Sequence, residues 1–327
     1  MKVIEFTEIG NPADVLMLKQ IPDQAPGAGE VKVKILATPI HPANLLQIAG
    51  QYAATPQLPS TPGGEGVGTV VAIGADVEHL QVGQNVLLAG VGGTWRDEIV
   101  APATAFLPAP PGDVEQLSML AVNPLTAHLM LEDFAELAAG DWIIQSAANS
   151  AVGEMVIQLA AQRGVNTVNI VRREDLIMPL KSLGGTVVLV DGPDLAERVR
   201  QATNGAEMRL AFDCVGGVTH QRMSETLGYG ASIVTYGTLS GQQPELNVSA
   251  LVTKDIRPRG FWLQQWYATA SQEQIQTALG ALVPLIASGQ IKTKIDSRFP
   301  LEEISEAVTR AAASGRDGKV LLVPNAA

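Results

Sequence analysis

The sequence is short of cysteine, of positive charge and of long apolar runs. Cys214 is the only cysteine in 327 residues, which excludes a disulfide framework and a zinc site built on thiolates. Lys and Arg total 22 against 33 Asp and Glu, a net charge of -11. A protein that binds nucleic acid or anionic membranes through its overall charge would need the opposite sign. No uninterrupted run of about 18 apolar residues predicts a membrane span.

These absences also bear on location. A single cysteine is typical of a reducing compartment, and the opening Met1–Phe6 predicts a strand, not a targeting segment. We therefore expect a cytoplasmic protein.

The length predicts two domains, because single hydrophobic cores stop growing near about 250–300 residues. Residues 2–117 show short strands separated by Gly and Pro, which is typical of a barrel-like β unit. In residues 118–265, apolar strands alternate with helices, and this indicates an α/β fold with a doubly wound parallel sheet. The tail, 266–327, mixes helices with strands, and we expect it to pack back on the N-terminal domain.

The first strand-to-helix turn of the middle region is the first candidate site. The strand 142–146 runs into Ala147–Val152, and a helix follows. A dinucleotide turn needs small residues here, because backbone N–H groups must approach a pyrophosphate at a helix N-terminus. Only Gly153 survives of the usual glycines, so the argument depends on the context of strand, turn and helix. An ordinary Asn/Ser helix cap is the alternative.

The end of the next strand indicates which cofactor is bound. Enzymes that use NAD place an acidic residue there, whereas enzymes that use NADP place cations for the 2′-phosphate. This chain has Arg172 and Arg173 at that position, and guanidinium groups suit a phosphate. Surface ion pairs with Glu174 and Asp175 are the alternative. The pattern favours NADPH.

No metal site is expected. The histidines lie at positions 41, 79, 128 and 220, without partners at ligand spacing. Without a Lewis acid, the chemistry favours reduction of an activated double bond over oxidation of an alcohol. Such a reduction creates an oxyanion and needs a proton. Tyr52 could supply both a hydrogen bond and a proton, or it could merely anchor a Pro-rich loop.

Several runs of residues match a known family. The chain resembles the zinc-free branch of the medium-chain dehydrogenase/reductases, and within it the trans-2-enoyl-thioester reductases of the mitochondrial type. The resemblance extends along nearly the whole chain. The matching runs are 48–52, 63–67, 93–96, 122–127, 140–145, 149–153, 169–172, 235–237, 259–263 and 265–266.

The resemblance implies a fold and a set of site residues. It implies a GroES-like catalytic domain over 1–117 and 266–327, and a Rossmann domain for NADPH over 118–265. It also implies that Tyr52 is the catalytic residue. The residues that would contact NADPH are Asn123, Asn149, Ser150, Ala151, Val152, Arg172, Arg173, Tyr236, Gly237, Thr238, Leu239, Phe261, Trp262, Leu263, Gln264 and Lys319.

The stretch before Tyr52 departs from the family. The family usually reads Ile-Asn-Pro-Ser-Asp-Ile-Asn, whereas this chain reads Ile-His-Pro-Ala-Asn-Leu-Leu over residues 40–46. His41, Asn44 and Trp95 are the residues expected near the substrate. His41 either relays a proton or is an ordinary packed histidine.

The leading interpretation is NADPH-dependent reduction of the C2=C3 bond of trans-2-enoyl thioesters of CoA or acyl carrier protein. The alternatives are an NADPH-dependent quinone or enone reductase and a non-catalytic NADPH-binding protein. We also expect a homodimer, because an apolar strand near 260–263 would be an exposed sheet edge in a monomer.

Overall fold

The chain forms two compact units. The computed structural model describes residues 1–325, so positions 326 and 327 of the expected catalytic domain lie outside the described residues. The first unit comprises Met1–Val122 with Leu279–Ala327, and the second comprises Asn123–Ala278. The sequence had placed the boundaries at 117/118 and 265/266. The first boundary lies later because Ala121 and Val122 lie beside Glu65 of the first unit. The second boundary lies later because Phe261, just before residues 263–278, packs on Phe134 of the second unit.

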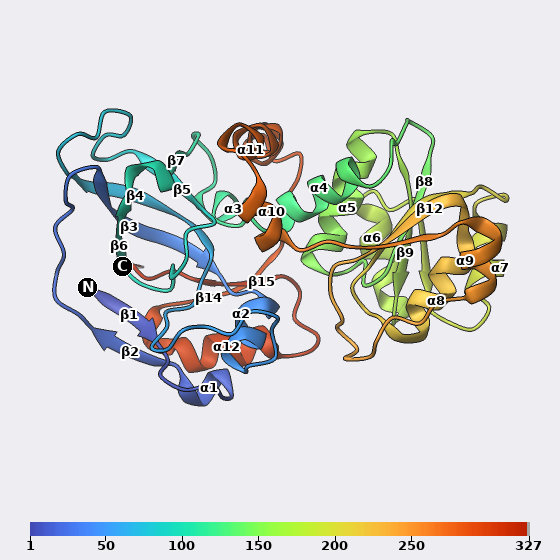
Figure 1. Ribbon diagram of the computed structural model, residues 1–327, viewed down its shortest axis with the longest axis horizontal. Coiled ribbons are helices and arrows are strands. Elements are labelled where there is room, and N and C mark those ends of the chain that lie inside the picture. The colour runs from blue at the N-terminus through green and yellow to red at the C-terminus, as the bar shows by residue number, and fades with distance from the viewer. Residues whose placement is uncertain (326–327) are drawn as a thin grey trace. The chain divides into compact units, whose positions relative to one another are not determined.

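The first unit is built on a seven-stranded sheet with the order β14-β15-β3-β4-β5-β7, and β6 pairs with β3 (Figure 1). The expectation that the tail packs back is confirmed, because β15 pairs with β3 and β14 pairs with β15. The strands of this unit are β1 (Lys2–Glu5), β2 (Met17–Gln20), β3 (Glu30–Pro39), β4 (Glu65–Ile73), β5 (Asn85–Ala89), β6 (Glu98–Pro102), β7 (Leu107–Pro108), β14 (Ile295–Phe299) and β15 (Lys319–Leu322).

The helices of the first unit are short. They are α1 (Pro12–Val15), α2 (Pro42–Ile48), α3 (Val114–Leu117) and α12 (Ile304–Ala312), and α11 (Gln272–Ala287) crosses the boundary between the units. The buried residues of α12 form an apolar stripe of Ile304, Ala307, Val308 and Ala311. This stripe shares a core with Ile48 of α2 and with Trp95.

The second unit is a parallel six-stranded sheet with the order β10-β9-β8-β11-β12-β13. In chain order this is 3-2-1-4-5-6, the arrangement of the Rossmann fold. Its strands are β8 (Trp142–Gln145), β9 (Asn166–Val171), β10 (Val187–Val190), β11 (Met208–Asp213), β12 (Leu227–Thr235) and β13 (Arg257–Gly260). The predicted α/β class and doubly wound sheet are confirmed.

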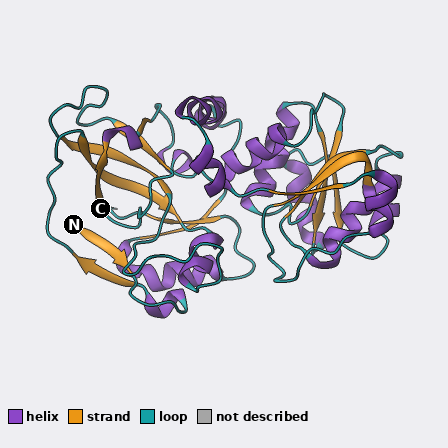
Figure 2. Cartoon of the chain, viewed as in Figure 1, coloured by secondary structure: helices purple, strands orange, loops and turns teal. Residues whose placement is uncertain are grey.

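Helices cover both faces of this sheet (Figure 2). One apolar cluster joins the sheet to α7, α8 and α9, and a separate cluster joins it to α5 and α6. The helices of the unit are α4 (Asn123–Asp133), α5 (Ala151–Gln162), α6 (Ile177–Ser182), α7 (Leu195–Ala202), α8 (Gly217–Thr226), α9 (Val248–Lys254) and α10 (Leu263–Thr269). The helix α5 gives way to Gly164, which has a φ of +68°.

One expectation about the sheet edge was wrong. The edge strand is β13, whose four residues Arg257–Gly260 are polar or small and all exposed. The apolar residues 261–263 lie beyond it, because Trp262 caps α10 and Leu263 is its first residue. No helix in residues 1–325 is both long enough and apolar enough to cross a bilayer.

Candidate active site

The turn between β8 and α5 has the geometry of an anion cradle. Ser150 caps α5, and its Oγ accepts a hydrogen bond from the Gly153 N–H at 3.1 Å. A Cβ on Gly153 would lie 2.6 Å from the carbonyl oxygen of Ala148, so only glycine lets the helix approach the turn this closely. The Ser cap named as the alternative is present, but it forms part of the turn and does not argue against a ligand. Helix N-termini of this kind favour phosphate groups.

A buried polar network ties this turn to its neighbours. The side-chain amide of Gln145 donates to Gly153 O at 3.0 Å and to Asn169 Oδ1 at 2.8 Å. Gln145 and Asn169 are fully buried, so these bonds satisfy groups that would otherwise be costly to bury. The network fixes α5 against both β8 and β9.

A second polar junction joins β8 to β11, the point where the strand order reverses. The Ser146 hydroxyl donates to Asp213 Oδ1 at 2.6 Å. Asp213 also accepts from the backbone N–H groups of Val215 and Gly216, each at 3.0 Å. Ligands of parallel sheets bind at this reversal. Ser146 and Asp213 were not among the residues expected from the sequence, although polar residues at the ends of two apolar strands are a usable signal.

Two arginines follow β9, as the sequence predicted. Arg172 and Arg173 are both exposed. Arg173 Nε lies 3.2 Å from Asp175 Oδ1, so part of the ion-pair alternative is present. That pair is mostly exposed, at 54% and 67% of the two side chains, and exposed pairs contribute little. Both guanidinium groups therefore stay available to an anion.

The other candidate cofactor residues of the second unit also follow strands. Residues 236–239 come after β12, and residues 261–264 come after β13. Because the strands are parallel, their carboxyl ends lie on one side of the sheet, and these segments, the turn and the arginines all follow those ends. Burial and the neighbouring Cys214 hold the pKa of Tyr236 well above its usual range, so its hydroxyl stays protonated. Asn123, at the start of α4, is buried, and its Nδ2 makes no hydrogen bond with any described residue.

Tyr52 belongs to the first unit and lies just beyond α2. The helix ends at Ile48, and Gly50 turns the chain with a φ of +69°. A Cβ on Gly50 would lie 2.6 Å from Cγ2 of Ile9. Both the positive φ and this close contact therefore require glycine at the turn. The Gln51 N–H returns to Leu46 O at 2.8 Å. The segment that carries Tyr52 is thus fastened to α2.

Of the three residues expected near the substrate, His41 and Trp95 are buried and Asn44 is partly buried. Trp95 is fully buried in the core, and its Nε1 makes no hydrogen bond with any described residue. Asn44 accepts the His41 backbone N–H on Oδ1 at 2.9 Å, which caps the start of α2. His41 is 6% exposed, and its Nε2 lies 2.6 Å from Oε1 of Glu65.

Lys319, expected at the cofactor, is buried in the first unit. Its Nζ lies 2.9 Å from Ile40 O and 2.9 Å from His41 Nδ1. Burial lowers the pKa of Lys319 to about 7 and raises the pKa of Glu65 to about 8, while each group's charge opposes the shift of the other. Burial, together with Lys319 and Arg316, holds the pKa of His41 well below its usual range. The sequence analysis did not connect Glu65 with His41 and Lys319.

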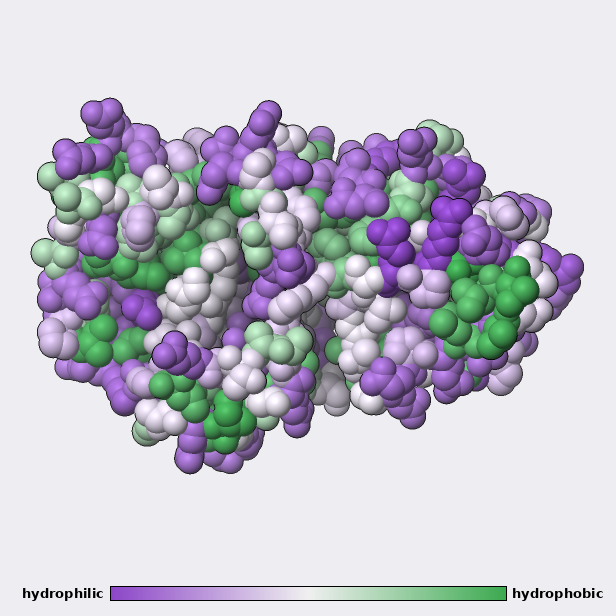
Figure 3. All heavy atoms as spheres, in the orientation of Figure 1, coloured by the Kyte–Doolittle hydropathy of each residue, from purple (hydrophilic) through white to green (hydrophobic). Residues whose placement is uncertain are grey.

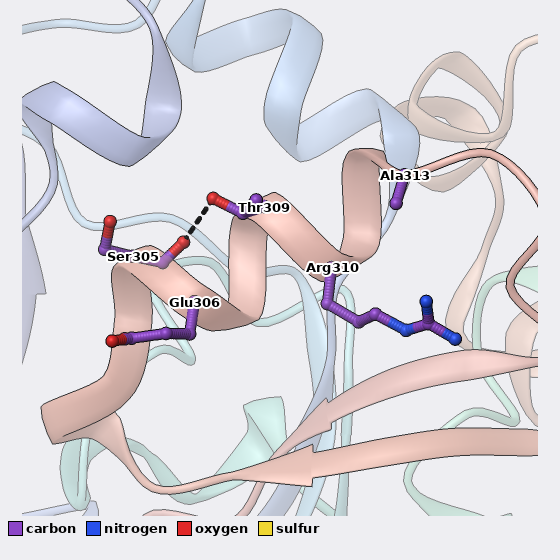
Figure 4. Close-up of a pocket in the computed structure, with 5 residues that line it drawn as sticks. All are labelled: Ser305, Glu306, Thr309, Arg310 and Ala313. Carbon is purple, nitrogen blue, oxygen red and sulfur yellow. Dashed lines mark hydrogen bonds between the residues drawn. The ribbon is translucent and has the colours of Figure 1, made fainter.

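The open pocket on α12 does not include any of the predicted site residues. It is lined by Ser305, Glu306, Thr309, Arg310 and Ala313 (Figure 4). Arg310 is engaged there with Asp296, at 2.7 Å between Nε and Oδ2. In residues 1–325, no three His, Cys, Asp or Glu side chains are grouped so that they could hold a metal ion. The donor set therefore does not fit zinc.

Comparison with known proteins places the chain in a family. Residues 151–283 match the model described as zinc-binding dehydrogenase, and residues 27–111 match the alcohol dehydrogenase GroES-like domain. The human mitochondrial enoyl-[acyl-carrier-protein] reductase is 37% identical over 318 residues, covering 94% of this chain and 84% of that protein.

Solved structures agree with this placement. A putative NADPH:quinone reductase from Bacillus thuringiensis superposes with a TM-score of 0.91 at 30% identity, covering 98% of both chains. The Etr1p/NADP/crotonyl-CoA complex gives 0.87 at 26% identity, covering 98% of this chain and 99% of that one. The chain belongs to the medium-chain dehydrogenase/reductase family.

Proposed function

We propose that this protein uses NADPH to reduce the C2=C3 double bond of trans-2-enoyl thioesters to the saturated acyl thioester. The observation that carries the proposal is the similarity of 94% of the chain to a protein named enoyl-[acyl-carrier-protein] reductase. The neighbour solved with NADP and crotonyl-CoA supports both the cofactor and the substrate class.

The second unit fits NADPH on its own evidence. The cap at Ser150 and the close approach at Gly153 would hold the pyrophosphate. Arg172 and Arg173 would hold the 2′-phosphate, since guanidinium groups pair well with phosphate. The segments after β12 and β13 and the unpaired Nδ2 of Asn123 would supply further contacts.

When bound, NADPH supplies a hydride, which the substrate accepts at C3. Negative charge then develops on the thioester oxygen and on C2. The phenol of Tyr52 would donate a hydrogen bond to this enolate and deliver the proton to C2, directly or through water. General acid assistance of this kind contributes about a hundred- to ten-thousandfold in rate.

Tyr52→Phe tests this role while keeping the ring. With crotonyl-CoA and NADPH we expect kcat to fall by about a hundredfold or more, with NADPH affinity and Tm nearly unchanged. If the variant keeps full kcat, Tyr52 anchors its loop and the proton comes from another group. If kcat falls only together with Tm, the residue is structural.

A quinone or enone reductase is the second candidate, favoured by the quinone reductase neighbour at 30% identity. NADPH oxidation with crotonyl-CoA, a longer enoyl-CoA and a naphthoquinone side by side separates the two. Faster turnover of the enoyl thioesters supports our proposal, and turnover of the quinone alone refutes it. NADPH binding without turnover of any of the three would identify a non-catalytic binding protein.

We also propose that the protein pairs with a second copy through β13. This strand is exposed along its whole length at the sheet edge, and exposed edges tend to pair. Figure 3 shows an apolar patch on the second unit over α9, where Val248 and Val252 are 68% and 75% exposed. Acyl carrier protein as a partner and a cytoplasmic location stay predictions.

A further inference from the structure

Three buried side chains in the first unit form a continuous hydrogen-bonded chain. Glu65 begins β4, His41 precedes α2 and Lys319 begins β15. They are 1%, 6% and 3% exposed. His41 lies between the other two, with 2.6 Å from its Nε2 to Glu65 Oε1 and 2.9 Å from its Nδ1 to Lys319 Nζ. We call these residues the buried triad.

When Lys319 is charged, its partners define one arrangement of the protons. An ammonium group can only donate, and Lys319 Nζ lies 2.9 Å from two acceptors, Ile40 O and His41 Nδ1. His41 Nδ1 therefore accepts, and the ring proton is on Nε2, which donates to Glu65 Oε1. A neutral imidazole thus bridges a buried ammonium and a buried carboxylate.

The same bonds support a second proton arrangement. One proton moves from Lys319 Nζ to His41 Nδ1, while the proton on His41 Nε2 moves to Glu65 Oε1. Lys319 becomes a neutral amine that still donates to Ile40 O, and Glu65 becomes a neutral acid that donates to His41. No proton is gained or lost, and the net charge of the triad is zero in both arrangements. Neither arrangement leaves a buried charge unpaired.

His41 is also the point where the triad meets α2. The backbone N–H of His41 is held by Asn44 Oδ1, and the N–H of Leu45 donates to His41 O. At the other end of the helix, the Gly10 N–H donates to Ile48 O at 3.1 Å. Because the Tyr52 segment returns to Leu46, the position of Tyr52 depends on where α2 begins.

We propose that Glu65, His41 and Lys319 form a proton-exchange triad that positions α2, and with it Tyr52, for the reaction. The inference depends on the proposed function only for the role of Tyr52. His41 here is a positioning residue, since it acts through α2 and does not contact the substrate.

The charges around the triad support exchange near neutral pH. Burial brings the pKa of Glu65 up and that of Lys319 down until the two nearly meet, which makes the charged and neutral arrangements similar in free energy. Arg316, in the loop before β15, is the other charged group that acts on His41 and Lys319. The N–H groups of Ala121 and Val122 act on Glu65.

Two substitutions of His41 separate positioning from simple packing. His41→Leu removes both bridging bonds. We expect kcat for crotonyl-CoA to fall by up to about a hundredfold, as for a misplaced reacting group, with KM for NADPH unchanged. His41→Gln offers an oxygen to Lys319 and an N–H to Glu65, and should restore most of kcat. His79→Gln, an exposed histidine of the same unit, is the matched control and should behave as the wild type.

Nitrogen NMR of the wild-type protein tests proton exchange without any assay of activity. The chain has four histidines, and His41→Gln assigns the signal of interest. We expect His41 to stay neutral from pH 6 to 9. The chemical shifts of both ring nitrogens should lie between the values of a protonated and an unprotonated imidazole nitrogen. A His41 that titrates like an exposed histidine, or that keeps one fixed tautomer, overturns the proposal.

The kcat measurements on the His41 variants can also refute the proposal. Full kcat in His41→Leu, or a His41→Gln variant no better than His41→Leu at equal Tm, overturns the positioning role. If the wild type reduces no enoyl thioester at all, the proposed function fails, while the NMR result still decides whether the triad exchanges protons.

Discussion

Removing Lys319 should make the stability of the first unit depend on pH. Lys319→Met keeps an unbranched apolar side chain that is one atom shorter and removes the amine, so Glu65 loses the positive charge that lowers its pKa. The pKa of Glu65, already raised to about 8 in the intact triad, should rise further. The folded variant then holds a protonated Glu65 at neutral pH, whereas the unfolded chain ionises this group near pH 4.3.

The magnitude follows from one proton taken up on folding. A group whose pKa is raised by folding contributes stability that is complete below its unfolded pKa and is lost as pH rises to its folded pKa. The free energy of unfolding of Lys319→Met should therefore fall by about 1.4 kcal/mol per pH unit, or about 2.7 kcal/mol from pH 6 to pH 8. In the wild type, the net-neutral triad binds as many protons as unfolded Lys and Glu together, so its contribution should be nearly flat between about pH 7 and 8, the pKa values of Lys319 and Glu65.

Urea unfolding at several pH values measures this slope. Trp95 is the only one of the four tryptophans in the first unit, so in a background with the other three replaced by Phe its fluorescence reports on that unit. Glu65→Gln should show the opposite slope, because the lowered pKa of Lys319 costs stability as pH falls. The double variant should be flat again, and Lys181→Met, an exposed lysine, is the control. A Lys319→Met slope equal to that of the wild type would refute the reasoning.

Three further predictions concern the cofactor site and the expected independence of metal. Arg172→Ala with Arg173→Ala should weaken NADPH binding about ten- to a hundredfold, since a charge-assisted contact contributes about 1.5–3 kcal/mol, and should leave NADH nearly unaffected; equal losses in titrations with both cofactors would exclude a 2′-phosphate site. Gly153→Ala should destabilise by about 1–3 kcal/mol through overpacking and weaken NADPH binding, whereas Gly280→Ala, where a Cβ meets nothing within 4 Å, should not. Activity should survive exhaustive phenanthroline treatment, and inhibition reversed by zinc alone would contradict metal independence.

The elements that bind the cofactor were predictable because their signals are local. The strand predicted over 142–146 is β8, which ends one residue earlier, and the turn and the helix follow it as predicted. The α/β alternation predicted the parallel sheet. It thereby also predicted that residues 149–152, 172–173 and 236–239 follow the carboxyl ends of neighbouring strands. Local periodicity and turn chemistry carry this information.

The buried triad was not predictable, because its members are separated by 24 and 278 positions along the chain. His41 was considered alone, as a relay or a packed residue, and it is packed between two ionisable groups. Lys319 was assigned to the cofactor by resemblance, and this assignment stays a prediction; within the chain its Nζ contacts Ile40 O and His41 Nδ1. The edge strand was misplaced for a different reason: the apolar run 261–263 looks like a strand, but a helix starts within it.

The most direct test of the central claim follows the hydride into the product. The purified protein is incubated with crotonyl-CoA and with NADPH that carries deuterium at both C4 positions of the nicotinamide. The acyl product is then analysed by mass spectrometry and NMR. We predict butyryl-CoA with a single deuterium at C3 and a solvent-derived hydrogen at C2. Recovery of unreduced crotonyl-CoA, while a naphthoquinone is reduced by the same preparation, would contradict enoyl-thioester reduction.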